Sequence, residues 1–118
     1  MISNAKITKT TLGYEDHGIL TLFIHVKGDG WGVAIGGYSL DDYSKESEKR
    51  IATRKGLELI AEILSVIGVQ NWEDLKGKNI RVDLSEGLGG KVKKIGNLIE
   101  DKWIDFEEFF KNEGGQKL

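Results

Sequence analysis

The sequence predicts an α+β domain: an antiparallel sheet of about five strands with one main helix, a single-turn helix and a short C-terminal helix. Three observations predict this class. Several short segments alternate apolar and polar residues, most clearly 19–26. Apolar residues then recur at the helical period between 57 and 67. Five of the fifteen residues from Gly28 to Asp42 are glycine, which marks turns between strands.

The first two strands lie in the N-terminal quarter of the chain. Residues 4–11 alternate weakly and predict the first strand, and 12–18, bounded by glycines, predict a turn. Residues 19–26 predict the second strand. Its apolar face carries Leu20, Leu22, Ile24 and Val26.

The glycine-rich stretch follows. Gly28–Gly30 predicts a hairpin turn and Trp31–Ile35 a third strand, antiparallel to the second. Gly36–Gly37 predicts a kink or bulge that delivers Tyr38 to a surface, because glycine in a strand marks a bend or a close backbone approach. The alternative is a tight hairpin whose glycines serve geometry alone and bind nothing.

The chain then leaves the sheet through residues 40–43, and 44–49 is polar, typical of a loop or a frayed helix start. From about Arg50 the period is helical, and Gly68 is placed to end the helix. The apolar stripe is wide enough for the helix to lie flat on the sheet or between protomers. It comprises Leu57, Leu59, Ile60, Ile63, Leu64, Val66 and Ile67.

The C-terminal half adds strands and short helices. Asn71 is expected to cap a single turn over 72–75, which Gly77 ends. Residues 79–84 alternate and predict a strand, followed by a glycine-rich turn over 86–90. The inward residues of that strand are Ile80, Val82 and Leu84.

The last strand is expected over 91–99, with a bulge near 93–94 because the alternation slips there. Residues 101–103 then turn, and Asp105 is expected to cap a short helix over 106–111. The whole chain, 1–118, is expected to form one ligand-binding domain, with 112–118 as a flexible tail.

Composition excludes several function classes. No cysteine means no disulfide and no thiolate chemistry. Seventeen basic against nineteen acidic residues give a net charge of −2, which argues against a duplex nucleic-acid face. The sequence has no long apolar run and no leader pattern, so we expect no membrane span and a cytoplasmic location.

Arginine is scarce, and two of the three arginines lie four residues apart. Arg50 and Arg54 are expected to share a face at the start of the main helix, where backbone N–H groups also favour an anion. The pair could hold a phosphate or pyrophosphate. The alternative is a solvated pair facing Glu46 or Glu58. Arg81 is the third arginine.

Catalytic and metal patterns are weak. Glu15, Asp16 and His17 could bind a metal or exchange a proton, although turn capping by Asp16 is the simpler interpretation. Asp41–Asp42 could bind a cation or a ribose hydroxyl, or simply end a strand. No nucleophile arrangement and no phosphate-binding loop is present, so the sequence favours a binding protein over an enzyme.

Four aromatic residues lie on or beside predicted strands, where a nucleotide base could stack. They are Phe23, Trp31, Tyr38 and Trp103, each of which could equally belong to the core. Asn97 interrupts the apolar run of the last strand and needs a hydrogen-bond partner. That partner could be a backbone group, a neighbouring protomer or a ligand.

An ordered set of blocks runs along the chain from about Ala5 to Phe110: LGYEDHGILTLFIHV, GGYSLDDY, Arg50–Thr53 before GLELIAEIL, NWEDLKGKNIRV and IGNLIEDKWIDFEEFF. This set resembles the small phage proteins that counter the bacterial Thoeris system, the Thoeris anti-defence sponges of the first type. The resemblance implies an oligomer that sequesters glycocyclic ADP-ribose, made by a TIR-domain enzyme, in pockets at protomer interfaces. It implies no cleavage and no cofactor, and in some members a second ligand class, cyclic oligonucleotides.

The resemblance also implies site residues: an aromatic ring and an Asn for the base, and arginines for the phosphates. Asn97 matches the base-contacting Asn, and Arg50 or Arg54 a phosphate contact. This chain departs from the family in its C-terminal segment, where only Lys111 and Lys117 replace arginines. The residues expected in the ligand site are Trp31, Gly37, Tyr38, Arg50, Arg54, Arg81, Asn97 and Lys111.

Two other functions stay open. The first is an inhibitor that blocks a host defence protein by direct contact, with the acidic segment from Glu100 to Glu113 as its contact face. The second is an enzyme that degrades the signal, for which Glu15, Asp16 and His17 are the candidate centre.

Overall fold

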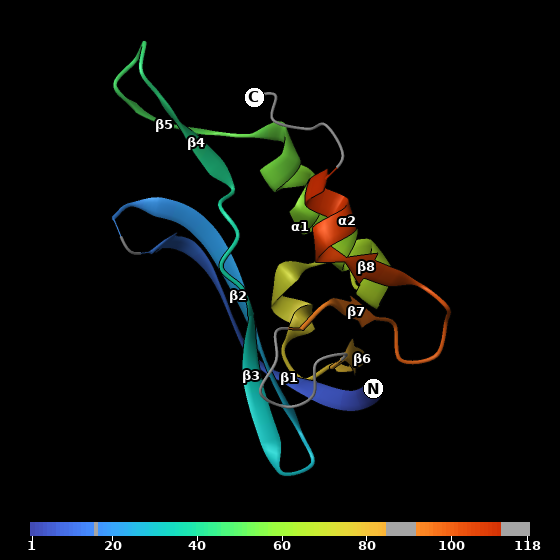
Figure 1. The fold of residues 1–118 in the computed structure, drawn as a ribbon. Coiled ribbons are helices and arrows are strands. Elements are labelled where there is room, and N and C mark those ends of the chain that lie inside the picture. Colours follow the sequence, from blue (N-terminus) through green and yellow to red (C-terminus); the bar gives the residue numbers. More distant parts are fainter. Residues whose placement is uncertain (16, 85–91, 112–118) are drawn as a thin grey trace.

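The structure is a computed structural model that describes residues 1–15, 17–84 and 92–111 (Figure 1). It confirms the α+β class, with a main antiparallel sheet of six strands in the order β3-β2-β1-β6-β7-β8 and a separate β4-β5 hairpin. The elements are β1 (Ile2–Glu15), β2 (Ile19–Gly28), β3 (Trp31–Gly36), β4 (Asp41–Ser44), β5 (Lys49–Ala52), α1 (Arg54–Ile67), the 3-10 turn η1 (Trp72–Leu75), β6 (Asn79–Asp83), β7 (Lys94–Gly96), β8 (Trp103–Asp105) and α2 (Phe106–Lys111).

The helices cover one face of the sheet, as Figure 1 shows. Leu59 and Ile63 of α1 are fully buried, and they belong to one core cluster with the inward residues of the strands. Those strand residues alternate with exposed ones, as half-buried strands require. They are Ile7 of β1, Ile24 of β2, Ile80 and Val82 of β6, and Ile95 of β7.

The first strand is longer than the sequence indicated. The predicted turn over 12–18 is wrong for its first residues, because β1 continues to Glu15 and pairs with β2 over residues 12–15. Leu12 lies opposite Leu22, and a bulge separates Ile7 from Lys9. Cross-strand pairing extended the strand past the glycine. Asp16 lies outside the described residues.

The predicted hairpin of the second and third strands is confirmed. β2 and β3 pair from Gly28↔Trp31 to Phe23↔Gly36, and Gly30 has the positive φ of 77° that the turn needs. The predicted inner face of β2 is also confirmed, with Leu22, Ile24 and Val26 buried and Leu20 partly buried.

The polar segment after β4 forms part of a hairpin rather than a loop or helix start. β4 and β5 pair from Asp41↔Ala52 to Ser44↔Lys49, so the helix begins at Arg54 and not near residue 50. Thr53 is its N-cap, and the Thr53 hydroxyl accepts a hydrogen bond from the Gly56 N–H at 2.9 Å. The predicted helix end is confirmed: Gly68 has φ 86° and its N–H donates to the Leu64 carbonyl.

Downstream, the single turn and the sixth strand are confirmed. η1 follows Asn71, although the Asn71 amide bonds the Asp74 carboxylate and no backbone N–H. Gly77 has a positive φ of 92° after that turn. β6 buries its predicted inward residues, Ile80, Val82 and Leu84.

The last strand is shorter than predicted, and β8 was missed. β7 is limited to Lys94–Gly96 and pairs with β6 without a register break, so no bulge at 93–94 is needed. The predicted turn at 101–103 ends in β8. The cap is confirmed, since the Asp105 carboxylate accepts from the Glu108 N–H at 3.1 Å. The predictions for 86–90 and 112–118 fall outside the described residues.

Among the residues that the structure describes, no helix is long and apolar enough to cross a membrane.

Candidate functional site

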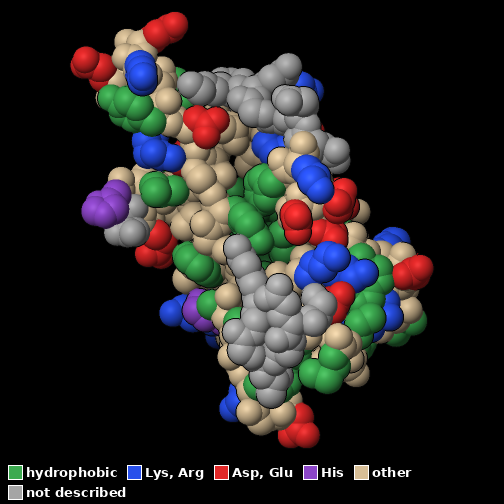
Figure 2. Space-filling view, in the orientation of Figure 1, with side chains coloured by type: hydrophobic (Ala, Val, Ile, Leu, Met, Phe, Trp, Pro, Cys, Tyr) green, Lys and Arg blue, Asp and Glu red, His purple; other side chains and the backbone are tan. Residues whose placement is uncertain are grey.

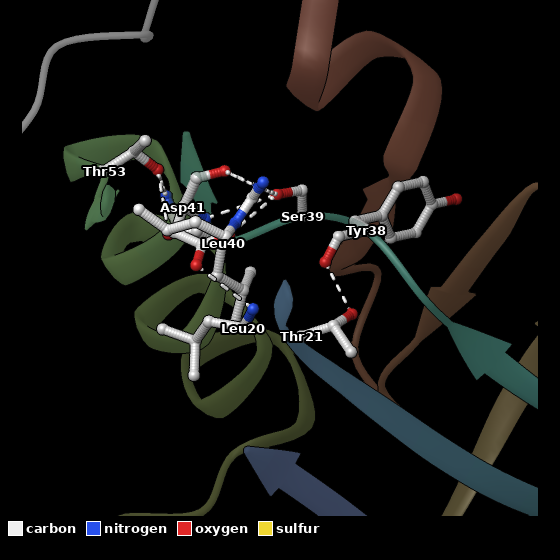
Figure 3. Close-up of polar contacts among 9 residues, drawn as sticks. Leu20, Thr21, Tyr38, Ser39, Leu40, Asp41 and Thr53 are labelled. Carbon is white, nitrogen blue, oxygen red and sulfur yellow. Dashed lines mark hydrogen bonds and ion pairs between the residues drawn. The ribbon is translucent and has the colours of Figure 1, made fainter. Parts of the chain in front are cut away.

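The glycine pair after β3 sets the position of Tyr38. Gly36 and Gly37 have φ of 129° and 80°, and a Cβ on Gly36 would collide with the Leu22 carbonyl oxygen. The Gly37 N–H donates to that oxygen at 2.9 Å, and the Thr21 hydroxyl donates to the Tyr38 carbonyl at 2.6 Å (Figure 3). The predicted kink is therefore present, but it leaves the Tyr38 ring half-buried against α2.

Tyr38 belongs to an aromatic row, which we define as Phe106, Tyr38, Phe110 and Phe109. The Tyr38 ring stacks on Phe110 and Phe106, with centroid distances of 4.8 and 5.2 Å. Phe109 meets Phe110 edge-on at 5.3 Å. Burial and the nearby Asp105 carboxylate raise the pKa of the Tyr38 hydroxyl. Phe106 is buried, whereas Tyr38, Phe109 and Phe110 are each partly accessible.

A lysine of α1 lies beside the last ring of the aromatic row. The Lys55 ammonium lies 4.0 Å from the centroid of the Phe109 ring, within cation–π range. Arg54 precedes it as the first residue of α1 and is exposed. The helix N-terminus adds a partial positive charge there. The structure thus brings Arg54 to the same end of α1 as the aromatic row.

A groove of about 340 Å³ runs between α1 and α2. Its lining residues are Lys55, Glu58, Ala61, Glu62, Ser65 and Phe109. Two carboxylates against one ammonium make the groove unfavourable for a phosphate. On the face drawn in Figure 2, hydrophobic side chains gather between the β4-β5 hairpin and α2, with charged side chains beside them. Arg54 is not part of the lining of that groove.

Arg50 does not share a helix face with Arg54, because its side chain joins β5 to Asp41 of β4 and to Ser39. Its guanidinium bonds the Asp41 carboxylate from Nε and Nη2 at 3.0 and 2.9 Å, and Nη2 also donates to the Ser39 hydroxyl at 3.2 Å. The other Asp41 oxygen accepts from the Leu20 N–H at 3.2 Å (Figure 3). The prediction that Arg50 and Arg54 share a helix face is wrong, because Arg50 lies in β5.

Asp41 is only 3% exposed, and its environment has opposing effects on its pKa. Burial raises the pKa, but hydrogen bonds from Arg50, the Leu20 N–H and Ser39 outweigh burial and hold it below its ordinary value. Asp42 is exposed, so the two carboxylates do not converge. The arrangement ties β4 and β5 to the start of β2 and leaves the Asp41 carboxylate no role in a cation or ribose site.

The Asn97 side chain takes the first of its three possible partners, the backbone. Its amide nitrogen donates to the Val66 and Ile67 carbonyls at 3.1 and 3.2 Å. Its oxygen accepts from the Ile99 and Glu100 N–H groups at 3.0 and 2.9 Å. Both donors and both lone pairs are engaged. The geometry assigns Asn97 to joining the end of α1 to the β7-β8 turn.

Arg81 braces the same turn. Its Nε and Nη2 donate to the Asn97 and Glu100 carbonyls at 2.7 and 2.8 Å. The guanidinium lies 4.5 Å from the Trp103 ring centroid, and the Lys94 ammonium lies 5.0 Å from it. This cation–aromatic cluster occupies the sheet face opposite the helices, since its strand neighbours Val82, Ile95 and Ile104 point into the core.

Trp31 lies at the opposite end of the β2-β3 hairpin from Tyr38, and Lys111 lies at the end of α2. Trp31 packs over Gly28 beside a shallow pocket of about 410 Å³ at the β2-β3 tip, which Figure 1 shows pointing away from β4 and β5. Lys111 ends α2 with its ammonium 3.7 Å from Glu108, both exposed. An exposed pair of this kind contributes little to stability.

Among the described residues, no group of three or more His, Asp or Glu side chains could hold a metal ion. Comparison with protein families, curated proteins and solved structures gives no match. Function has to be inferred from the residues and their geometry.

The structure brings together part of the predicted site. Tyr38 and its Gly37 hinge lie against α2, which Lys111 ends, and Arg54 begins α1 beside Lys55. Arg50, Trp31 and the pair Arg81 and Asn97 lie elsewhere. Sequence reasoning missed the α2 phenylalanines as partners of Tyr38 and of Lys55. Their only signal was the FEEFF run, which is equally typical of a core helix.

Proposed function

We propose that this protein binds a cyclic ADP-ribose-type signalling nucleotide and sequesters it without cleaving it, as a phage anti-defence protein in the cytoplasm of the infected bacterium. The observation that carries this proposal is the ordered set of sequence blocks in this chain, which resembles the Thoeris anti-defence sponges. Glycocyclic ADP-ribose is the first ligand to test, and cyclic oligonucleotides are the second.

The aromatic row supports the proposal because it offers rings on which the base could stack. Phe109 and Phe110 are half-buried, so each retains an accessible part on which adenine can stack. Stacking of one base on an aromatic side chain is worth about 1–3 kcal/mol. Lys55 over Phe109 would add charge to the same surface.

The start of α1 supports the proposal because it offers positive charge that could bind the phosphates. Arg54 is exposed in the first turn, where the helix dipole favours an anion. A guanidinium can contact a phosphate in two-pronged fashion. Glu58 and Glu62 repel an anion from the groove, so the pyrophosphate would bind toward Arg54. A second copy of the chain would complete the pocket, as the resemblance implies.

Calorimetry with glycocyclic ADP-ribose tests the proposal. A sponge needs a dissociation constant of about nanomolar, roughly −12 kcal/mol. Heating the complex and recovering the ligand should return the intact molecule. Absence of binding, or recovery of a cleaved product, would contradict the proposal.

A matched pair of variants tests the residue assignment. Arg54→Ala should weaken binding by roughly tenfold or more, because hydrogen bonds to a charged group contribute about 1.5–3 kcal/mol each. Lys45→Ala, an exposed cation of the β4-β5 turn, is the control and should leave affinity unchanged. Equal affinities for the two variants would remove Arg54 from the site.

One observation favours a second candidate, an inhibitor that blocks a host protein by direct contact. Ile99 is 86% exposed on the β7-β8 turn, beside the acidic residues Glu100 and Asp101, and the Asn97 amide holds that turn rigid. Ile99 would place its apolar side chain at the centre of such a contact, with the acidic residues at the polar rim. Stoichiometric capture of a host protein that Ile99→Asp abolishes, without a bound small molecule, would favour this candidate.

A further inference from the structure

Both edges of β1 are paired only around Lys6 and Ile7, where β2 lies on one side and β6 with its preceding turn lies on the other. β6 pairs with residues Ile2–Lys6, and Ile7 exchanges backbone hydrogen bonds with Lys78 and Gly77. From Lys9 onward β1 pairs, among the described residues, with β2 alone. The second half of β1 is therefore an edge strand.

The backbone of this half points its hydrogen-bonding groups outward. The Leu22 carbonyl accepts from the Gly37 N–H on the β3 side, so Leu22 points away from β1. Leu12 lies opposite Leu22, and in an antiparallel ladder both members of such a pair point away from each other. The N–H and C=O of Leu12 thus face the free edge, and Tyr14, opposite Leu20, repeats the pattern.

The side chains along the edge are apolar on one face and charged on the other. Leu12 and Tyr14 share a face and are 43% and 72% exposed. Lys9 and Glu15 lie on the opposite face, at either end of the segment, and both are exposed. Folded proteins usually protect an edge with proline, charged side chains, a bulge or a covering element, and the bulge at Lys9 marks the start of this edge. The segment KTTLGYE has no proline.

We propose that this edge pairs antiparallel with the same edge of a second copy, about a two-fold axis at Leu12. This register places Lys9 of each copy opposite Glu15 of the other, Thr10 opposite Tyr14, and Leu12 opposite Leu12. A register centred one residue earlier leaves Lys9 opposite Gly13, and one centred a residue later leaves Glu15 opposite Thr11. Opposite charges favour the register centred on Leu12.

The pairing is self-complementary, as a two-fold interface must be. Leu12 and Tyr14 gain apolar contacts on one face while the outward backbone groups gain partners. The inference adds an interface to the proposed function. It rests on that function for the expectation that copies of the chain associate. The observations that carry it involve no ligand.

Charge variants test the register by sedimentation equilibrium of the ligand-free protein. Lys9→Glu alone and Glu15→Lys alone should each weaken self-association by about tenfold, since like charges then oppose each other at two places. An equimolar mixture of the two variants should associate as the wild type does, and so should the double variant. Lys27→Glu, an exposed strand lysine outside the edge, is the control.

Amide hydrogen exchange by NMR tests the hydrogen bonds. The Leu12 and Tyr14 amides should be protected only at concentrations where copies associate, whereas Thr11 and Gly13, which face β2, should be protected at all concentrations. A monomeric wild type, or single variants that associate normally, would overturn the inference. If the edge pairs but no nucleotide binds, the proposed function is wrong and the inference stands. If the nucleotide binds but copies associate through another surface, only the inference about the β1 edge is wrong.

Discussion

At the scale of single residues, two polar side chains near the core decide how distant segments join. Asn97 links the last carbonyls of α1 to the β7-β8 turn, and Asp41 links β2, β4 and Arg50 of β5. Each is surrounded by partners with which it is fully hydrogen-bonded, as burial of a polar group requires. Both residue types had suggested a ligand role from sequence, and both serve the fold in the structure.

Asp41 makes stability depend on pH in a definite direction. Its pKa is lowered in the folded protein, so its contribution is complete above the ordinary value of 3.8 and is lost as pH falls through the lower folded value. Urea denaturation at several pH values should show this loss, and Asp41→Asn should reduce the slope below pH 3.8. At neutral pH, Asp41→Ala should cost about 2–3 kcal/mol. An unchanged acid profile for Asp41→Asn would remove this carboxylate as the cause.

At the scale of elements, the start of α1 is set by contact with the preceding segment. Thr53 caps the helix and also donates to the Leu40 carbonyl at 3.2 Å. Gly56 packs on Leu40 so closely that a Cβ would stand 2.5 Å from its carbonyl oxygen. The first turn of α1 therefore packs directly on the segment before β4, and only a glycine fits at that contact.

At Gly56, the steric cost of a larger residue should outweigh the gain in helix propensity. Gly56→Ala would gain about 1 kcal/mol in an isolated helix, but here the Cβ meets backbone, and we expect a net loss of about 1–3 kcal/mol. Gly13→Ala is the control, because a Cβ there meets nothing within 4 Å. Chemical denaturation of both variants measures the difference. A stabilised Gly56→Ala would show that α1 can move away from Leu40.

At the scale of the molecule, the chain is elongated, with extents of 47 × 26 × 25 Å. Its radius of gyration is 14.6 Å, above the roughly 13.5 Å of a compact domain of this length. Figure 1 shows the cause: the outer half of the β1-β2 pair and the β4-β5 hairpin project from the core. Tyr14 and Tyr43 are exposed on these projections, at 72% and 55%. Such a shape leaves surface for a second copy.

Binding and self-association should be linked if the nucleotide pocket lies between copies. Glycocyclic ADP-ribose should then shift the monomer–dimer equilibrium toward the dimer, because a ligand that prefers one state raises its population. Sedimentation velocity with and without ligand measures the shift, and linear ADP-ribose is the control nucleotide. Tight binding without any shift would place the pocket within one protomer.

The sequence by itself determined the features that depend on neighbours along the chain. The α+β class, the glycine hairpin after β2, the end of α1 at Gly68 and the Asp105 cap all follow from local backbone preference and side-chain periodicity. The kink before Tyr38 also follows, since it needs only two glycines. Part of the candidate site was therefore predictable.

The tertiary structure alone decided the features that depend on distant partners. Arg50 lies in a strand because β5 pairs with β4, β1 passes its glycine because β2 continues beside it, and Asn97 is engaged because α1 ends next to it. The aromatic row joins Tyr38 to α2 across nearly seventy residues of chain. Neighbouring residues in the sequence do not predict these pairings. The free energy that stabilises them comes from contacts that exist only once the sheet and helices are assembled.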